Sequence, residues 1–539
     1  MAIFEANLKQ PMNPFLLPYN TKHNTAPFSK IELDHFAPAV EEGIKQAMSE
    51  IDAIVENKAM PTFENTVVAL ERTGEVLDKV TSVFFNLNSA ETSPEMQELA
   101  QHISPKLTAF KNDVMMNAGL FDKVKTVYEG SYIELTAEDQ MLLDRTYKSF
   151  VRNGANLNSD QQATLRDIDT QLAQKSLTFG EHVLQESNAY QLYIEDKKDL
   201  AGLPQGIIDA AALSAEQHGE KGRWLFTLDY PSYIPFMTYS AVRELRERMY
   251  KAFSSKAFAG NENDNQAIVI EIATLRQQRA ELLGFESHAH FVLAERMAES
   301  PEKVYDFLQN IQDKALPFAE KEFKSLTAYA QDLDGLTKLQ KWDGAYYAEK
   351  LKKEKFNIDD ELLRPYFKLD QVVQGVFDTA SKLFGLTFNQ VQDIDVYHDD
   401  VETYEVTDET GKHLAVFYAD FFPRPGKRQG AWMTSYRSQK VVDGDDHRPH
   451  VSIVCNFTKP TDTKPSLLTF NEVTTLFHEF GHALHGMLAN GTYASLSGAN
   501  VYWDFVELPS QLMENWCYEK LCLDQFAKHY QTGETIPQD

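Results

Sequence analysis

The chain has 539 residues, of which 43% are hydrophobic and 12% aromatic, and 80 acidic against 52 basic side chains give it a formal net charge of −28. This length exceeds what one hydrophobic core normally organises, so two or more packed lobes are expected. The acidic excess disfavours nucleic acid as a partner, because phosphate backbones are bound by clustered Lys and Arg.

The sequence gives no signal for secretion or for insertion into a membrane. Its first twenty residues lack a basic start followed by an apolar stretch, and no uninterrupted apolar run of about 18 residues occurs elsewhere. Cys455, Cys517 and Cys522 form no CxxC pair, so three reduced thiols are predicted. We therefore expect a cytoplasmic, monomeric protein with no membrane partner.

Helical periodicity dominates the first three quarters of the chain. Between Pro61 and Phe84, apolar residues recur about every 3.6 positions. Ser300 followed by Pro301 predicts an N-cap and a first helical position, and an apolar stripe over 304–315 continues that helix. Further helices are predicted at 33–56, 95–117, 159–188, 239–258 and 264–283. The fold class expected is mainly α.

The pattern changes to short extended segments near residue 400. Residues 402–406 and 414–421 are predicted strands joined by a turn, and two more extended segments are expected around 431–436 and 451–457. A small β-sheet is therefore predicted at about 400–457. An exposed edge of such a sheet can bind an extended peptide by strand addition.

The strongest chemical signal is the segment His478-Glu479-Phe480-Gly481-His482. Residues four apart share one face of a helix, so His478 and His482 can present two imidazole nitrogens to one metal ion. Glu479 can reach a water bound to that ion without being a ligand, which is the position of a general base. The alternative, a solvated helix face without metal, is disfavoured by the apolar helical context.

A third metal ligand is expected from a segment further along the chain. Zinc peptidases add a carboxylate or a third His and leave one position for water. A third His six residues beyond His482 is excluded because that position is Leu488. Glu507, in the segment 504–516, lies 25 residues past His482 and can supply a carboxylate. His485 is expected to pack beside the site, because ligation by it would close the water position.

These residues closely resemble the thimet-oligopeptidase family of zinc peptidases. The resemblance covers nearly the whole chain and rests on the following segments: 477–486, 504–516, Gly-Ala-Trp-Met at 430–433, Cys-Asn-Phe at 455–457 and Met-Asn-Pro-Phe at 12–15. It implies that His478, His482 and Glu507 hold one Zn²⁺ and that Glu479 is the base. It also implies an elongated, mainly helical molecule of two lobes with the small sheet next to the zinc-site helix. The deep channel between the lobes would admit short unstructured peptides.

Within that family, residues 484–487 and 507–511 look most like the bacterial peptidyl-dipeptidase branch. Zinc-dependent release of C-terminal dipeptides from short peptides is therefore the leading hypothesis. The alternative of an endo-acting oligopeptidase of the same fold is left open. So is that of a zinc- and peptide-binding fragment without turnover, because family members continue past Asp539 into a substrate-binding loop. Asp504 and Gln511 are candidates to accept hydrogen bonds from the ligand His rings.

The domain organisation expected is an N-terminal helical lobe over 1–225 and a catalytic region over 226–539. The catalytic region would contain the sheet and the zinc site at 478–516, without the C-terminal part of the family domain. No Gly/Ser-rich or Pro-rich linker marks a border, so the lobes are expected to share elements.

Four other histidines are given no catalytic role. His288 and His290 are two apart and point to different helix faces, and His447 and His450 flank Pro449 in an Asp-rich stretch where they are expected to face solvent.

Overall fold

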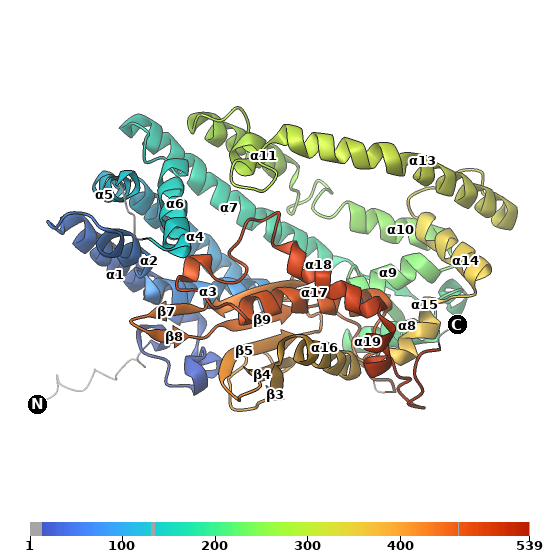
Figure 1. Ribbon diagram of the computed structural model, residues 1–539. Helices are drawn as coiled ribbons and strands as arrows, with labels where there is room; N and C mark the ends of the chain where they lie inside the picture. Colours follow the sequence, from blue (N-terminus) through green and yellow to red (C-terminus); the bar gives the residue numbers. More distant parts are fainter. Residues whose placement is uncertain (1–12, 131–134, 462, 538–539) are drawn as a thin grey trace, which may run out of the picture.

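The computed structural model describes residues 13–130, 135–461 and 463–537, so Met12 of the Met-Asn-Pro-Phe segment lies outside it. Helices dominate the described chain, as predicted (Figure 1). The α-helices are α1 (Phe36–Glu56), α2 (Ala69–Glu71), α3 (Glu75–Ala90), α4 (Pro94–Met115), α5 (Ala118–Glu129), α6 (Ala137–Arg152), α7 (Ser159–Ala189), α8 (Gln205–Gln217), α9 (Tyr230–Tyr239), α10 (Arg243–Ser254), α11 (Gln266–Leu282), α12 (His288–Leu293), α13 (Pro301–Asp334), α14 (Gly344–Phe356), α15 (Asp360–Leu363), α16 (Leu369–Phe384), α17 (Phe470–Met487), α18 (Glu507–Glu514) and α19 (Lys520–Phe526).

The predicted helices are present, with one interruption. The periodic stretch from Pro61 to Phe84 is broken into a π-helix at Phe63–Val68, α2 and α3. The break precedes α3 at Gly74, whose φ of 80° is a left-handed conformation that glycine adopts without strain. Hydrophobic periodicity alone does not report such a turn.

The predicted strands form most of a five-stranded sheet in the order β3-β4-β5-β9-β6. The β5–β9 pair is parallel and the other neighbours are antiparallel. The strands of the structure are β1 (Leu192–Ile194), β2 (Trp224–Phe226), β3 (Thr387–Gln390), β4 (Val401–Thr407), β5 (His413–Asp420), β6 (Trp432–Arg437), β7 (Lys440–Val442), β8 (Asp445–His447) and β9 (His450–Val454). The expectation for His450 was wrong: it begins β9 inside the sheet and is 2% exposed.

The two faces of this sheet are buried against different helices. On one face, Phe417 and Val451 share a core with α16 and α17. On the other, Val416 and Tyr418 share a core with residues of α1 and α3. N-terminal helices and the sheet therefore share a core, whereas the division at residue 225 stays a prediction. No helix among the described residues is long and apolar enough to cross a membrane.

Helix α13 differs from the buried helices. Ser300 is its N-cap, as predicted, and the Ser300 hydroxyl accepts a hydrogen bond from the Lys303 backbone. The apolar stripe that predicted this helix faces solvent, however: Phe307 is 66% exposed and Ile311 is 47% exposed. Figure 1 shows α13 along the outer edge of the molecule, away from the sheet.

Candidate metal centre

Helix α17 is fixed at its start and along its apolar face. Thr469 and Glu472 form a reciprocal capping box, which satisfies backbone donors that the first turn leaves free. Glu472 also accepts hydrogen bonds from the backbone and hydroxyl of Thr458, tying the helix start to the preceding loop. Leu476 and Phe480 are almost fully buried against the sheet. His478 and His482 lie on the opposite face of α17.

A glycine lets α18 approach α17 closely enough to complete the cluster. A Cβ atom at Gly481 would lie 2.6 Å from the Cα of Ser510 and 2.8 Å from the carbonyl oxygen of Pro509. A Cβ carbon does not approach backbone atoms that closely, so only glycine fits at this crossing without displacing α18. The glycine inside the His-Glu-Phe-Gly-His segment thus sets the distance between the two helices, and with it the position of Glu507.

The structure brings His478, His482 and Glu507 together; we call these three residues the α17 cluster. The Nε2 atoms of both imidazoles lie 3.1 Å from the same Glu507 oxygen. Ligands at about 2.0–2.1 Å from a tetrahedral ion are about 3.3 Å apart, so these donors are spaced for one ion. Burial lowers the pKa of His482, although Glu507 opposes the shift. A neutral imidazole has the free lone pair that a metal requires.

The orienting partner of the cluster is Glu514, which the sequence analysis missed. The Nδ1 of His478 and the Oε1 of Glu514 are 2.6 Å apart, so this ring nitrogen donates and Nε2 is left for an ion. Asp504 instead accepts hydrogen bonds from the backbone of Met297 and Ala298, and Gln511 is exposed. The ring contact belongs to Glu514, and a role for Asp504 or Gln511 beside the ligand rings stays a prediction. Glu514 follows Glu507 by two helical turns, so both lie on one face of α18.

Glu479 is the buried carboxylate of the site, with 6% of its surface exposed. Burial raises its pKa to about 7; His478 opposes the shift and Glu507 adds to it. A carboxyl group in such an environment can both accept and return a proton near neutral pH. The hydroxyl of Ser510, a fully buried residue of α18, lies 2.9 Å from both the backbone carbonyl oxygen of Glu507 and the Glu507 carboxylate oxygen that faces the imidazoles, and it can donate a hydrogen bond to either.

The chain resembles known peptidases over almost its whole length. Residues 236–539 match Peptidase family M3. Over 534 residues the chain is 38% identical to oligopeptidase A of Salmonella typhimurium, covering 98% of this chain and 78% of the relative. Dipeptidyl carboxypeptidase of Escherichia coli gives the same identity and the same coverage. The chain belongs to peptidase family M3.

Membership of family M3 confirms the predictions of a metallopeptidase that hydrolyses peptides. A plant relative, a probable cytosolic oligopeptidase A of Arabidopsis thaliana, is 34% identical over 532 residues, covering 95% of this chain and 75% of the relative. The chain spans about four-fifths of the length of its bacterial relatives. Because it is equally similar to relatives named for two cleavage modes, identity does not separate dipeptide release from internal cleavage.

The sheet edge nearest α17 in this M3 peptidase is β6, which pairs only with β9 within the sheet order of the described residues. Side chains of α3 cover part of its outer edge: Asn86 donates to the carbonyl of Ser435, and Ser82 donates to that of Tyr436. Trp432 and Met433, at the start of the strand, are half-buried. The part of the edge suited to strand addition is therefore the beginning of β6.

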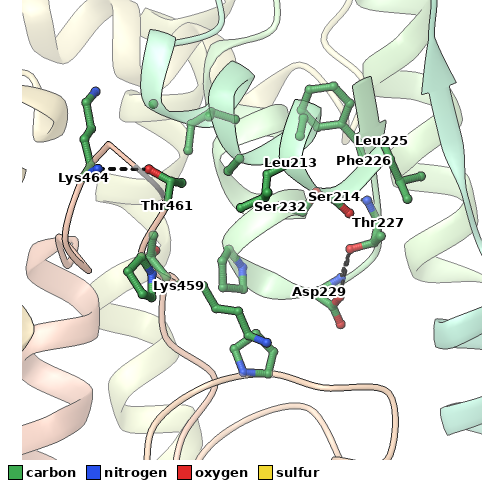
Figure 2. Close-up of a pocket in the computed structure, with 18 of the residues that line it drawn as sticks. Leu213, Ser214, Leu225, Phe226, Thr227, Asp229, Ser232, Lys459, Thr461 and Lys464 are labelled. Carbon is green, nitrogen blue, oxygen red and sulfur yellow. Dashed lines mark hydrogen bonds between the residues drawn. The ribbon is translucent and has the colours of Figure 1, made fainter. Parts of the chain in front are cut away.

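A cavity of about 630 Å³ lies between α8, β2 and the loop 458–467, which leads into α17. Figure 2 shows Lys459 and Lys464 on the loop side and Thr227 and Asp229 on the other. Thr227 donates a hydrogen bond to Asp229 at 2.9 Å. The residues that line the cavity belong to both the 1–225 and the 226–539 parts of the chain, and the α17 cluster is not among them.

Proposed function

We propose that the α17 cluster holds one zinc ion and that Glu479 acts as the general base of peptide hydrolysis. The observation that carries the proposal is the approach of two imidazole Nε2 atoms to 3.1 Å from one Glu507 oxygen, next to a buried carboxylate. Two imidazoles and a carboxylate are the donor set of catalytic zinc sites that keep a fourth position open. When bound, the ion would polarise the scissile carbonyl and acidify the attacking water.

Glu479 is the group that moves the proton. It accepts a proton from water as the new C–O bond forms, and it returns that proton to the amine nitrogen as the C–N bond breaks. A pKa of about 7 suits both steps, because the carboxylate is then neither too weak a base nor too weak an acid. Its burial keeps bulk water from competing for the proton.

Glu514 and Ser510 are positioning residues in this mechanism. Glu514 fixes the tautomer of His478 by accepting from its Nδ1. Ser510 holds the Glu507 oxygen that faces the two rings. Both act through a ligand and do not touch the reacting atoms.

The proposed substrates are short unstructured peptides, from which the enzyme releases C-terminal dipeptides. The half-buried start of β6, at the edge of the sheet, supports binding in an extended conformation, because a strand edge offers backbone hydrogen bonds to any sequence. An endo-acting oligopeptidase uses the same centre and is the alternative. We propose that the protein acts in the cytoplasm; its three buried free cysteines and the similarity to a probable cytosolic oligopeptidase A of a plant support this compartment. We also propose that it acts as a monomer.

The test is hydrolysis of an N-terminally blocked tetrapeptide by the zinc-loaded protein. We expect a blocked dipeptide and a free dipeptide as products, and loss of cleavage on adding a chelator. His482→Ala should abolish cleavage, and His447→Gln, a change at an exposed residue, should not. A folded, zinc-loaded sample that shows no chelator-sensitive cleavage contradicts the proposal. Cleavage of the C-terminally amidated peptide at an equal rate favours the endo-acting alternative.

A further inference from the structure

We propose a second transition-metal site, formed by His23, Glu405 and His413, which we call the sheet cluster. His23 belongs to the turn Lys22–Asn24, Glu405 to β4 and His413 to the start of β5. Each residue offers one donor atom within 4.8 Å of the other two. The class of ligand is a divalent first-row ion such as Zn²⁺ or Ni²⁺, which imidazole and carboxylate groups bind together.

The spacing of the donors suits one ion. The Oε1 atom of Glu405 lies 2.8 Å from the Nε2 of His23 and 3.5 Å from the Nδ1 of His413. These distances bracket the separation of about 3.3 Å between neighbouring ligands of a tetrahedral ion. The three side chains are between 21% and 23% exposed, so an ion there would be largely shielded while keeping a path from solvent.

Unpartnered imidazole nitrogens give an independent indication of a missing ligand. Both ring nitrogens of His413 are buried without a hydrogen-bond partner. His450, 2% exposed, hydrogen bonds with the backbone of His23 through one nitrogen, and its Nε2 has no hydrogen-bond partner. An imidazole that donates to a backbone carbonyl through one nitrogen keeps the other free for a metal. Buried polar atoms are otherwise nearly always paired.

The surrounding charges leave one carboxylate oxygen available. Lys22 lies 3.3 Å from the Oε2 of Glu405 and 3.2 Å from Asp393, so its charge is shared and the Oε1 faces the imidazoles. Burial works against ionisation of Glu405, but Lys22 and His23 outweigh it and keep the pKa of Glu405 below its usual value. The pKa of His413 is lowered to about 4, chiefly by burial. The carboxylate is thus charged and the imidazole neutral near pH 7, as ligands must be.

Binding requires one ring to move. The rings of His23 and His413 are stacked, with centroids 3.7 Å apart and planes 2° from parallel. No single ion can lie in the plane of both rings in that arrangement. His23 is on a short surface turn, with a φ of 54°, whereas His413 begins β5 and pairs with Thr407 of β4. We therefore expect the His23 ring to rotate out of the stack when the ion binds, while its Nε2 stays beside the Glu405 oxygen.

A bound ion would join the N-terminal turn to the β4–β5 pair. Tyr404 and Val406 face α17, so Glu405 between them faces away, and the sheet separates the two clusters. His478 is followed in the sequence by a carboxylate, Glu479, whereas His23 and His413 are followed by Asn24 and Leu414. We therefore assign this site a structural role, linking the N-terminal turn to the β4–β5 pair, and no catalytic role. The proposal of this second metal site does not depend on the proposed peptidase mechanism.

The test uses the full chain carrying His478→Ala and His482→Ala, which removes the imidazole ligands of the α17 cluster. After treatment with a chelator, the protein is titrated with Ni²⁺ by isothermal titration calorimetry, and one equivalent is expected. Adding Glu405→Gln should weaken this binding by more than the roughly 10–100-fold that loss of an outer hydrogen-bond partner causes. The matched control His447→Gln, at an exposed residue of β8, should leave it unchanged.

A second variant keeps the test decisive if Glu405→Gln disturbs folding. His23→Asn changes only a surface turn, and Asn tolerates the positive φ found there. It should also weaken Ni²⁺ binding, with an unchanged circular dichroism spectrum. Absence of Ni²⁺ binding in the His478→Ala/His482→Ala protein overturns the proposal. The proposal is also overturned if His23→Asn leaves the affinity for Ni²⁺ unchanged.

Discussion

The α17 cluster and the sheet cluster have the same donors, two imidazoles and one carboxylate, but they are built differently. In the α17 cluster both imidazoles come from one helix, four residues apart, and a close helix crossing adds the carboxylate. In the sheet cluster the N-terminal turn supplies His23, the paired strands β4 and β5 supply Glu405 and His413, and the two rings are stacked. Only the α17 cluster has a buried carboxylate beside the first ligand. The type of donor therefore does not by itself distinguish a catalytic metal centre from a structural one. An adjacent general base and a fixed donor geometry are the distinguishing features.

Glu479→Gln should have the largest effect, because it removes the base and keeps the shape of the site. We expect turnover to fall by about 10²–10⁴-fold, the usual contribution of general acid–base catalysis. The measurement is kcat on the blocked tetrapeptide, with zinc content determined in parallel. The exposed Glu519 offers a matched control, and Glu519→Gln should keep full activity. Unchanged turnover in Glu479→Gln would remove the basis for calling the α17 cluster catalytic.

Glu514→Gln tests whether the outer hydrogen bond to His478 tunes the α17 cluster. An amide can still accept from Nδ1, but it loses the negative charge that strengthens the bond and raises the basicity of the ring. Zinc affinity or activity should fall by about 10–100-fold. Gln511→Ala, on the same helix but exposed, should change neither quantity. If the two variants behave alike in a competition titration with a chromogenic chelator, Glu514 has no orienting role.

Gly481→Ala tests the helix crossing that holds Glu507. The new methyl group would lie 2.6 Å from the Cα of Ser510, a backbone contact that forces α18 outward. Overpacking of this kind costs about 1–3 kcal/mol of stability, and moving Glu507 should weaken zinc binding as well. Denaturant unfolding and zinc titration measure the two effects. Gly344, at the start of α14, has nothing within 4 Å of a Cβ position, so Gly344→Ala should be harmless.

Much of the α17 cluster could be predicted from the sequence because its information is local. Spacing of four residues places His478 and His482 on one helix face. The apolar residues Leu476, Phe480 and Leu484 predict which face is buried. Glu514 was missed because its role depends on how α18 packs on α17. The sheet cluster could not be predicted, since strand pairing and a turn bring its members together. His450 was assigned to solvent for the same reason: its burial depends on the parallel pairing of β5 with β9.

The fold was predictable to a similar degree. Periodicity predicted several of the helices, and the extended segments predicted at 402–406, 414–421, 431–436 and 451–457 correspond to β4, β5, β6 and β9, whereas β3 was not predicted. A sequence pattern does not tell which part of the fold packs on an apolar stripe. The stripes of α17 and α13 have similar patterns, but they differ in how far they are buried. Leu476 of α17 is 2% exposed, whereas Leu308 of α13 is 53% exposed.

The smallest effect is expected on α13, and it extends the comparison from clusters to whole helices. Leu308→Ala removes little buried surface, so the free energy of unfolding should change by no more than about 0.5 kcal/mol. Leu476→Ala removes the same atoms from the core beneath the metal centre and should cost about 2–5 kcal/mol. Urea unfolding of both variants, followed by circular dichroism, measures the difference. A cost for Leu308→Ala that approaches that of Leu476→Ala would mean that the α13 stripe is covered in solution, by another molecule or by more of the polypeptide.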